Sequence, residues 1–285
     1  MLNQYRRLVP TVAFGVLAGF TTGCTWLESR DNLNKGVNAY KNAKFAEAAE
    51  LFRKAAELDP KNENAELYLA SAYMTQWIPG ADSPENNDLA KKARGVFMKV
   101  YEKNNKSELA IESLASLSFN EAKATLASGE GAARRKAKFE EAKEWYTKLI
   151  QLNPKKAAAF YSLGVIAWEN WYPVLMEARS KMSMKPEDPG PLKDKKVREE
   201  LKAQYGQLVE DGISNLRKAL EADPEYDDAM AYLNLLIRER ADLADTPEGY
   251  KKDVEEADNW VQKTLETKKM KAEKANKTTG IVADK

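Results

Sequence analysis

The sequence predicts an all-α protein built from repeated pairs of helices. A pattern of small and aromatic residues in 36–60 recurs at a spacing of about 34 residues along the 285-residue chain. A fixed period of this length is typical of architectures in which each helical unit packs on the next. Ala, Leu, Glu and Lys, which favour helix, dominate the composition, and no run of alternating Val, Ile and Thr suggests a sheet. We therefore expect about five helix-turn-helix repeats across residues 29–266.

The first 23 residues are expected to be a signal peptide outside the repeats. Arg6 and Arg7 give a positively charged start, and an apolar stretch of about 13 residues follows in 8–20. That stretch is shorter than the roughly 20 residues needed to span a membrane, but it has the length of a secretory signal core. Residues 24–28 would then form a short tether to the first repeat.

The end of this segment resembles a bacterial lipobox, because Gly23 precedes Cys24, the only cysteine of the chain. The resemblance implies that Cys24 is acylated and holds the protein on the periplasmic side of a membrane. Thr25, which is not Asp, favours the outer membrane by analogy with known sorting rules. Thr21 departs from the pattern, since Leu is usual three residues before the cysteine. Two alternatives remain: an ordinary signal peptidase releases the protein, or the apolar segment stays as a short anchor.

The first repeat shows most clearly how two helices would pack. Gly36 is small where the helices must approach closely. Ala48, Phe52 and Ala55 are spaced four and three residues apart, which places them on one face of the second helix. Pro60 ends that helix, because proline cannot continue it.

The later repeats carry the same kinds of residue at corresponding positions. These are Leu69, Ala70 and Tyr73, then Ala93, Phe97 and Val100 in the second repeat; Leu114 and Ala115, then Phe139, Ala142, Tyr146 and Leu149 in the third; Leu163, Gly164 and Ala167, then Gly212, Leu216 and Ala219 in the fourth; and Met230, Leu233 and Ile237, then Ala257, Trp260 and Val261 in the fifth.

This pattern resembles the tetratricopeptide repeat (TPR) family, and with the lipobox it resembles a bacterial TPR lipoprotein. The resemblance implies a helical solenoid that works by binding other molecules. The chain departs from the family in two ways. Lys35 stands where Leu is usual, and each later repeat has about 11 to 36 extra residues between its first and second helices. Because these inserted segments fall at the same kind of turn, they are expected to thicken one edge of the solenoid.

The composition excludes several kinds of chemistry. The chain has no histidine and a single cysteine, which rules out His-based triads and zinc sites, cysteine clusters and internal disulfides. Lys and Arg number 45 against 44 Asp and Glu, so there is no basic field to attract nucleic acid. We expect no catalytic residue, metal or cofactor, and we expect that the protein is not an enzyme.

In the TPR family the first helix of each pair lines a concave groove that binds partners. This implies nine candidate groove residues here: Tyr40, Lys41, Leu67, Met74, Phe119, Asn120, Tyr161, Trp168 and Arg238. Large apolar or aromatic residues dominate the set, which suits a peptide with apolar anchors. Alternatively, these residues pack against the inserted segments and close the groove. Leu33 and Val37 occupy positions where a chaperone-type carboxylate clamp needs Lys and Asn, which argues against capture of a free C-terminus.

Residues 267–285 carry six Lys and two acids and are expected to form a flexible, solvated tail, which could instead touch anionic lipid or cell-wall polymer. Taken together, the sequence predicts a membrane-anchored TPR adaptor that binds a protein partner in the bacterial cell envelope. One alternative is a cell-wall polymer binder or carbohydrate-active protein that uses the groove aromatics. Another is a structural spacer whose groove is filled by its own insertions. The oligomeric state stays open.

Overall fold

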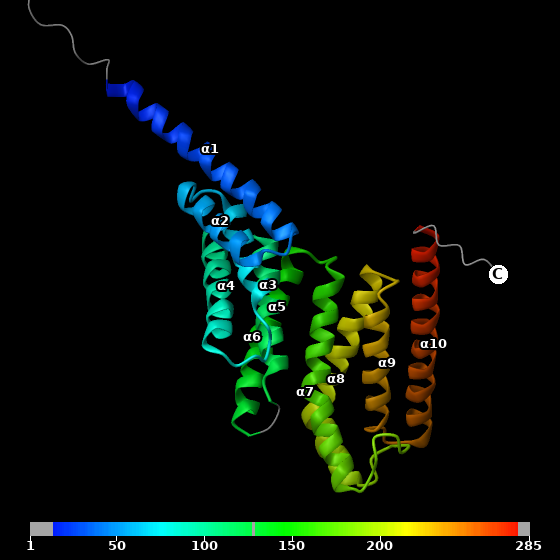
Figure 1. Cartoon of the computed structure of the whole chain (residues 1–285). Helices are drawn as coiled ribbons and strands as arrows, with labels where there is room; N and C mark the ends of the chain where they lie inside the picture. Colours follow the sequence, from blue (N-terminus) through cyan, green and yellow to red (C-terminus); the bar gives the residue numbers. More distant parts are fainter. Residues whose placement is uncertain (1–13, 127–128, 279–285) are drawn as a thin grey trace, which may run out of the picture. The chain divides into compact units, whose positions relative to one another are not determined.

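The computed structural model describes residues 14–126 and 129–278, and the side chains within 25–126 and 129–276. In this described part the chain contains ten helices and no strand (Figure 1). Their bounds are α1 Phe14–Lys41, α2 Phe45–Leu58, α3 Glu63–Gln76, α4 Pro84–Lys103, α5 Glu108–Ala124, α6 Glu130–Leu152, α7 Ala157–Lys181, α8 Lys195–Ala222, α9 Asp227–Ala241 and α10 Pro247–Thr278. The expected all-α architecture of successive helix pairs is confirmed.

Neighbouring helices pack on one another in sequence order. In residues 1–120, α1 contacts α2, α2 contacts α3, and α3 contacts α4. In residues 121–285, α6 contacts α7, and the series continues through α10. These two ranges form separate compact units, whose boundary falls within α5, and each unit is described by itself.

The first unit shows why the repeat begins with a small residue. A Cβ atom on Gly36 would lie 2.6 Å from Cε1 of Phe52, so a larger residue in α1 would collide with the ring that α2 places there. Ala48, Phe52 and Ala55 are all buried, as their spacing predicts. The hydroxyl of Ser29 donates to the carbonyl of Ala55 at 2.8 Å, which fixes α1 against α2 at a second point.

The second unit uses two glycines in the same way. A Cβ on Gly164 of α7 would lie 2.4 Å from Cγ of Leu216 in α8. A Cβ on Gly212 of α8 would lie 2.7 Å from Cβ of Ala167 and 2.8 Å from Cδ1 of Leu236. The close approach of α7, α8 and α9 therefore depends on residues without a side chain at these two crossings.

The inserted residues are used partly to lengthen helices and partly as ordered loops. α7 has 25 residues and α8 has 28, and the loop 182–194 joins them. Between α3 and α4, the side chain of Asn86 organises the shorter loop. It accepts a hydrogen bond from the amide of Ile78 and donates to the carbonyls of Ile78 and Ala81, each at 2.8 Å. The inserted residues therefore form both helix and loop.

The start of α1 covers part of the predicted signal peptide and tether. The backbone of 14–24 is helical, whereas the side chains of these residues, including Cys24, lie outside the described part, as do residues 1–13. The rest of the tether, 25–28, is helical and continuous with the first repeat. Trp26 and Leu27 are exposed there, and the guanidinium of Arg30 lies 4.9 Å from the centre of the Trp26 ring.

The last helix continues past residue 266 to Thr278, into the segment expected to be a flexible tail. Thr267 is buried. Lys271 forms an ion pair with Asp227 at the start of α9, and Lys274 pairs with Glu225 at 2.7 Å. Acidic residues at the beginning of α9 thus hold the basic end of α10. Among the described residues, we find no helix with both the length and the apolarity required to cross a membrane.

Candidate functional site

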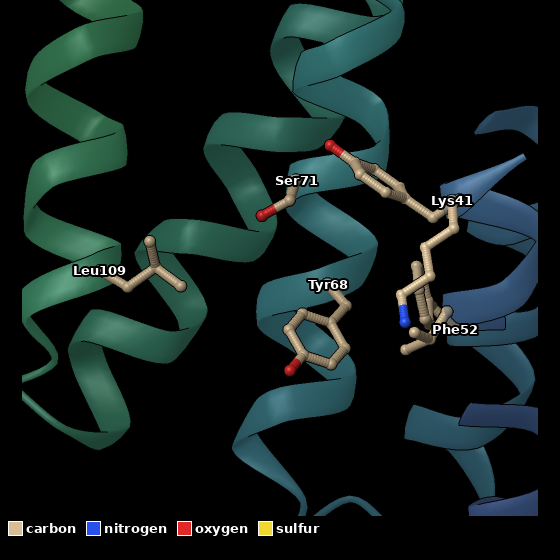
Figure 2. A pocket seen from close by; sticks show the side chains of 7 residues that line it. Lys41, Phe52, Tyr68, Ser71 and Leu109 are labelled. Atoms are coloured by element: carbon tan, nitrogen blue, oxygen red, sulfur yellow. The ribbon is translucent and has the colours of Figure 1, made fainter. Parts of the chain in front are cut away.

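The first unit contains a pocket on the helices that the repeat pattern assigns to a partner groove. The pocket has a volume of about 350 Å³ and receives side chains from α1, α2, α3 and α5 (Figure 2). Its lining residues are Val37, Tyr40, Lys41, Phe52, Tyr68, Ser71 and Leu109. Five of these seven are apolar or aromatic, so the pocket favours an apolar group.

Aromatic contacts hold the pocket in shape. Phe52 is 2% exposed, and its ring lies 5.5 Å from the ring of Tyr68. The hydroxyl of Tyr40 shares a hydrogen bond of 2.7 Å with the hydroxyl of Thr75 in α3, while its ring meets Phe45 edge-on at 5.1 Å. Tyr68 and Leu109, by contrast, are 38% and 44% exposed, so they present apolar surface to solvent at the mouth of the pocket.

Lys41 is the one charged residue among those that line this pocket. Figure 2 shows its ammonium group beside Phe52, on the side that faces Tyr68. In the described part of the chain, no carboxylate lies within ion-pair distance of Lys41. Nearby cations differ in this respect, since Lys35 pairs with Asp31, and Lys44 with Glu47.

The second unit gathers five aromatic residues from α7 and the start of α9. This α7–α9 aromatic cluster consists of Tyr161, Trp168, Tyr172, Tyr226 and Tyr232. Ring centres lie 4.9 Å apart for Tyr161 and Tyr226, 4.8 Å for the stacked pair Trp168 and Tyr172, and 5.5 Å for Trp168 and Tyr232. Burial raises the pKa of Tyr161, Tyr226 and Tyr232 above its usual value. The rings therefore shelter one another from water.

Trp168 also forms a hydrogen bond within the second unit. Its indole nitrogen donates to Oε1 of Glu239 at 2.8 Å. Glu239 is 9% exposed, and its Oε2 atom has no hydrogen-bond partner. Burial raises the pKa of Glu239 to about 8, and nearby Asp242 adds to this effect, whereas the Trp168 hydrogen bond lowers the pKa. Burial therefore favours the protonated form of this carboxyl group at pH values where an exposed Glu is ionised.

No family model matches the chain, and no curated protein matches it in sequence. Among solved structures, the crystal structure of MamA protein is 18% identical, covers 86% of this chain and 94% of its own chain, and has a TM-score of 0.51. MamA 41-end from Desulfovibrio magneticus RS-1 is 14% identical, covers 85% and 96%, and has a TM-score of 0.50. A thermophilic TPR protein in Thermus thermophilus is 15% identical, covers 83% and 99%, and has a TM-score of 0.44.

The chain has the TPR fold. Within residues 14–126 and 129–278, five helix pairs follow one another, and most of the positions predicted from the TPR pattern are buried; Tyr73, Leu163, Trp260 and Val261 are partly exposed. These comparisons concern the fold alone, because the sequences of the matched structures differ from this one at more than four positions in five.

The predicted groove residues separate into different surroundings. Tyr40 and Lys41 line the pocket of the first unit together. Leu67 is buried in α3, whereas Met74 of α3, and Phe119 and Asn120 of α5, are half-buried and do not line that pocket.

In the second unit, Tyr161 and Trp168 belong to the α7–α9 aromatic cluster, and Arg238 pairs with Asp258 at 2.5 Å. Full burial of Tyr40, Phe119 and Trp168 would favour the alternative of a self-filled groove. All three are only half-buried.

The TPR pattern also maps Val37 and Ser71 to the groove face, whereas three pocket residues, Phe52, Tyr68 and Leu109, were not predicted as groove residues. Tyr68 lies three positions before Ser71 on α3, so helical spacing from a mapped position could have identified it. Phe52 was assigned only to the contact between the first two helices, yet its ring edge also forms a wall of the pocket. No pattern in the sequence distinguishes Leu109, because its role depends on how α5 packs near α3.

The chemistry of these surfaces suits binding. Within the residues described here, no group of three or more His, Cys, Asp and Glu side chains is placed to hold a metal ion. The first unit offers aromatic and aliphatic walls with one ammonium group, which can anchor a partner side chain.

Proposed function

We propose that this protein is a membrane-anchored TPR adaptor that binds a protein partner in the bacterial cell envelope. The observation that carries the proposal is the pocket of the first unit. Helices α1 and α3, which the TPR pattern assigns to a partner groove, supply five of its lining residues, and Tyr68 and Leu109 remain open to solvent beside it. Exposed apolar surface next to a shaped pocket is the usual feature of a protein-binding site.

The proposed anchor is a lipid on Cys24. Its support is the single cysteine after Gly23 and the apolar stretch 8–20. Acyl chains bury CH₂ groups in the bilayer at about 0.8 kcal/mol each, so more than one chain gives a stable attachment. With a short tether, the first repeat would lie close to the membrane, and the residue after the cysteine, Thr25, favours the outer membrane. The exposed Trp26 and Leu27 lie next to the proposed lipid in the sequence.

Replacing the cysteine tests the anchor. The native protein should incorporate radiolabelled palmitate and stay with membranes after a high-salt wash, whereas Cys24→Ser protein should carry no label and leave the membrane fraction. If Cys24→Ser protein stays entirely with salt-washed membranes, the lipid anchor is contradicted, and a retained apolar segment explains the attachment. If the native protein is cleaved, unlabelled and soluble, an ordinary signal peptidase releases it.

A crosslinking pull-down from detergent-solubilised membranes tests the adaptor. The native protein should recover a specific partner, and a Tyr40→Ala/Lys41→Ala variant should recover at least several-fold less of it. Equal recovery with both forms would move the binding surface away from the pocket. Recovery of no protein would contradict the adaptor function.

The second unit offers little support for the alternative that the protein binds cell-wall polymer. Trp168 is the strongest candidate for stacking on a sugar, but its ring already stacks on Tyr172 and its indole nitrogen is bonded to Glu239. We therefore propose neither polymer binding nor an enzymatic activity for this chain.

A further inference from the structure

The size of the pocket in the first unit limits what can occupy it. At about 350 Å³, it lies at the lower end of the range of about 300–1,000 Å³ found for ligand sites. Such a volume takes one or two bulky side chains rather than a large cofactor. The walls at Phe52, Tyr68 and Leu109 provide the apolar surroundings that such side chains prefer.

The pocket is also formed in advance. Phe52 is fixed by its close contact with Gly36, and the hydroxyl of Tyr40 is held by Thr75. Ser71 donates its hydroxyl to the carbonyl of Leu67 at 2.8 Å, so this hydrogen is already used within α3 and is not available to a ligand. A partner side chain would therefore meet an ordered apolar surface and would not have to rearrange it.

The charge of Lys41 indicates a second chemical property of the partner. Lys41 places a single ammonium group at this apolar site, without a carboxylate partner among the described residues. On the same helix Lys35 is paired with Asp31, and on α2 Arg53 is paired with Glu50 and Glu57. An unpaired cation next to a pocket favours an anionic group on the molecule that binds there.

We infer that the pocket binds a segment of a partner protein in which a bulky apolar side chain lies close to an Asp or Glu side chain. The apolar side chain enters between Phe52, Tyr68 and Leu109, and the carboxylate pairs with Lys41. This inference rests on the proposed function, since it specifies the chemistry of that protein partner. A side-chain carboxylate fits better than a free C-terminus, because Leu33 and Val37 supply no further polar donors on the same face of α1.

Selection from a random peptide library tests this inference without a known partner. The probe is a library of random 12-residue peptides displayed within a loop, which removes free termini, and the target is the purified full chain in detergent. Enriched sequences should combine Phe, Leu, Met or Trp with Asp or Glu within four positions. Resynthesised with both ends blocked, they should bind the protein in fluorescence anisotropy.

Variants of the pocket then distinguish the two parts of the site. Lys41→Glu and Leu109→Ala should each weaken the selected peptides about tenfold or more, and Lys41→Arg should retain most of the affinity. The control is Lys54→Glu, which makes the same charge change on an exposed α2 residue that does not line the pocket, and it should have little effect. Circular dichroism checks that each variant remains helical.

Three results would overturn the inference: no enrichment, enrichment of sequences that lack acidic residues, or equal loss of binding for Lys41→Glu and Lys54→Glu. A preference for peptides with a free C-terminal carboxylate over blocked ones would also overturn it, in favour of terminal capture. If a partner is nevertheless recovered from membranes, the adaptor function stands and only its assignment to this pocket fails.

Discussion

Among single residues, Glu239 gives the second unit a stability that depends on pH. Its pKa is raised from an ordinary value of 4.5 to about 8, chiefly by burial. Between these two pH values the folded protein holds a proton that the unfolded chain releases. The stabilisation is therefore complete below about pH 4.5 and is lost as the pH rises through about 8.

Glu239→Gln should remove this dependence, because an amide cannot ionise but can still accept the hydrogen bond from Trp168. One unit of pKa corresponds to about 1.4 kcal/mol. As the pH rises from about 5 to about 8, the free energy of unfolding of the native protein should therefore fall by roughly 2–4 kcal/mol relative to that of the variant. Urea denaturation at several pH values measures the difference. Parallel pH profiles for the two proteins would contradict this assignment.

Arg179 is a residue whose replacement should strongly destabilise the protein. It is 3% exposed and donates to Asp242 at 2.6 Å and to the carbonyls of Lys185 and Asp188 at 2.7 and 2.5 Å. Arg179→Met leaves the Asp242 carboxylate buried without its partner, so the free energy of unfolding should fall by about 3–5 kcal/mol. Loop 182–194 loses two anchors at the same time, and trypsin should cleave it faster.

Lys181→Met provides the control on the same helix. Lys181 pairs with Glu177 at 2.6 Å, but both side chains are more than 60% exposed, so this pair contributes little. The free energy of unfolding should change by less than about 0.5 kcal/mol. Similar losses for Arg179→Met and Lys181→Met would show that the buried pair does not hold the loop.

At the scale of the helices, two glycines of α8 make a direct test of the packing. A Cβ at Gly212 would overlap Ala167 and Leu236, whereas a Cβ at Gly206 would meet only Cγ of Lys202, at 3.8 Å. Gly212→Ala should destabilise the protein by about 1–3 kcal/mol, and Gly206→Ala should stabilise it by up to about 1 kcal/mol, because Ala favours helix. Chemical denaturation measures both. Changes of the same sign would contradict the crossing geometry.

The helices also show how far the sequence can predict this fold. Small residues such as Gly36 and Gly212 identify the crossings directly, because only one kind of residue fits there. The secondary structure of the inserted segments was harder to predict. Residues within them that favour helix extend α7 and α8, and a repeat period does not say whether extra residues continue a helix or form a loop. In the same way, the continuation of α10 depends on its contacts with the start of α9.

The candidate site was predictable where it depends on helical register and not where it depends on contacts between helices. Tyr40 and Lys41 follow from their positions on the first helix, and both line the pocket. Leu109 and the bond between Trp168 and Glu239 do not follow from any spacing, because they join residues of helices far apart in the sequence. The same groove register therefore gives an open pocket in one unit and a sheltered aromatic cluster in the other.

At the scale of the whole molecule, the proposed lipid anchor on Cys24 would hold the binding surface of the first unit at a membrane. The surface would make the protein an adaptor, since it offers an apolar pocket on the helices that the TPR pattern assigns to a partner groove. The central claim for this molecule is that a partner protein binds at this pocket in the cell. Fractionation of the Cys24→Ser protein tests the anchor, and peptide selection tests the chemistry of the pocket.

Site-specific photocrosslinking in living cells tests it most directly. A photoreactive benzoylphenylalanine is placed at Leu109 beside the pocket, and in a second strain at Lys54, which is exposed on α2 but does not line the pocket. We expect irradiation to give a discrete crosslinked protein from position 109 that is absent from position 54 and reduced when Lys41→Glu is added. No crosslink from position 109, or the same product from both positions, would contradict the central claim.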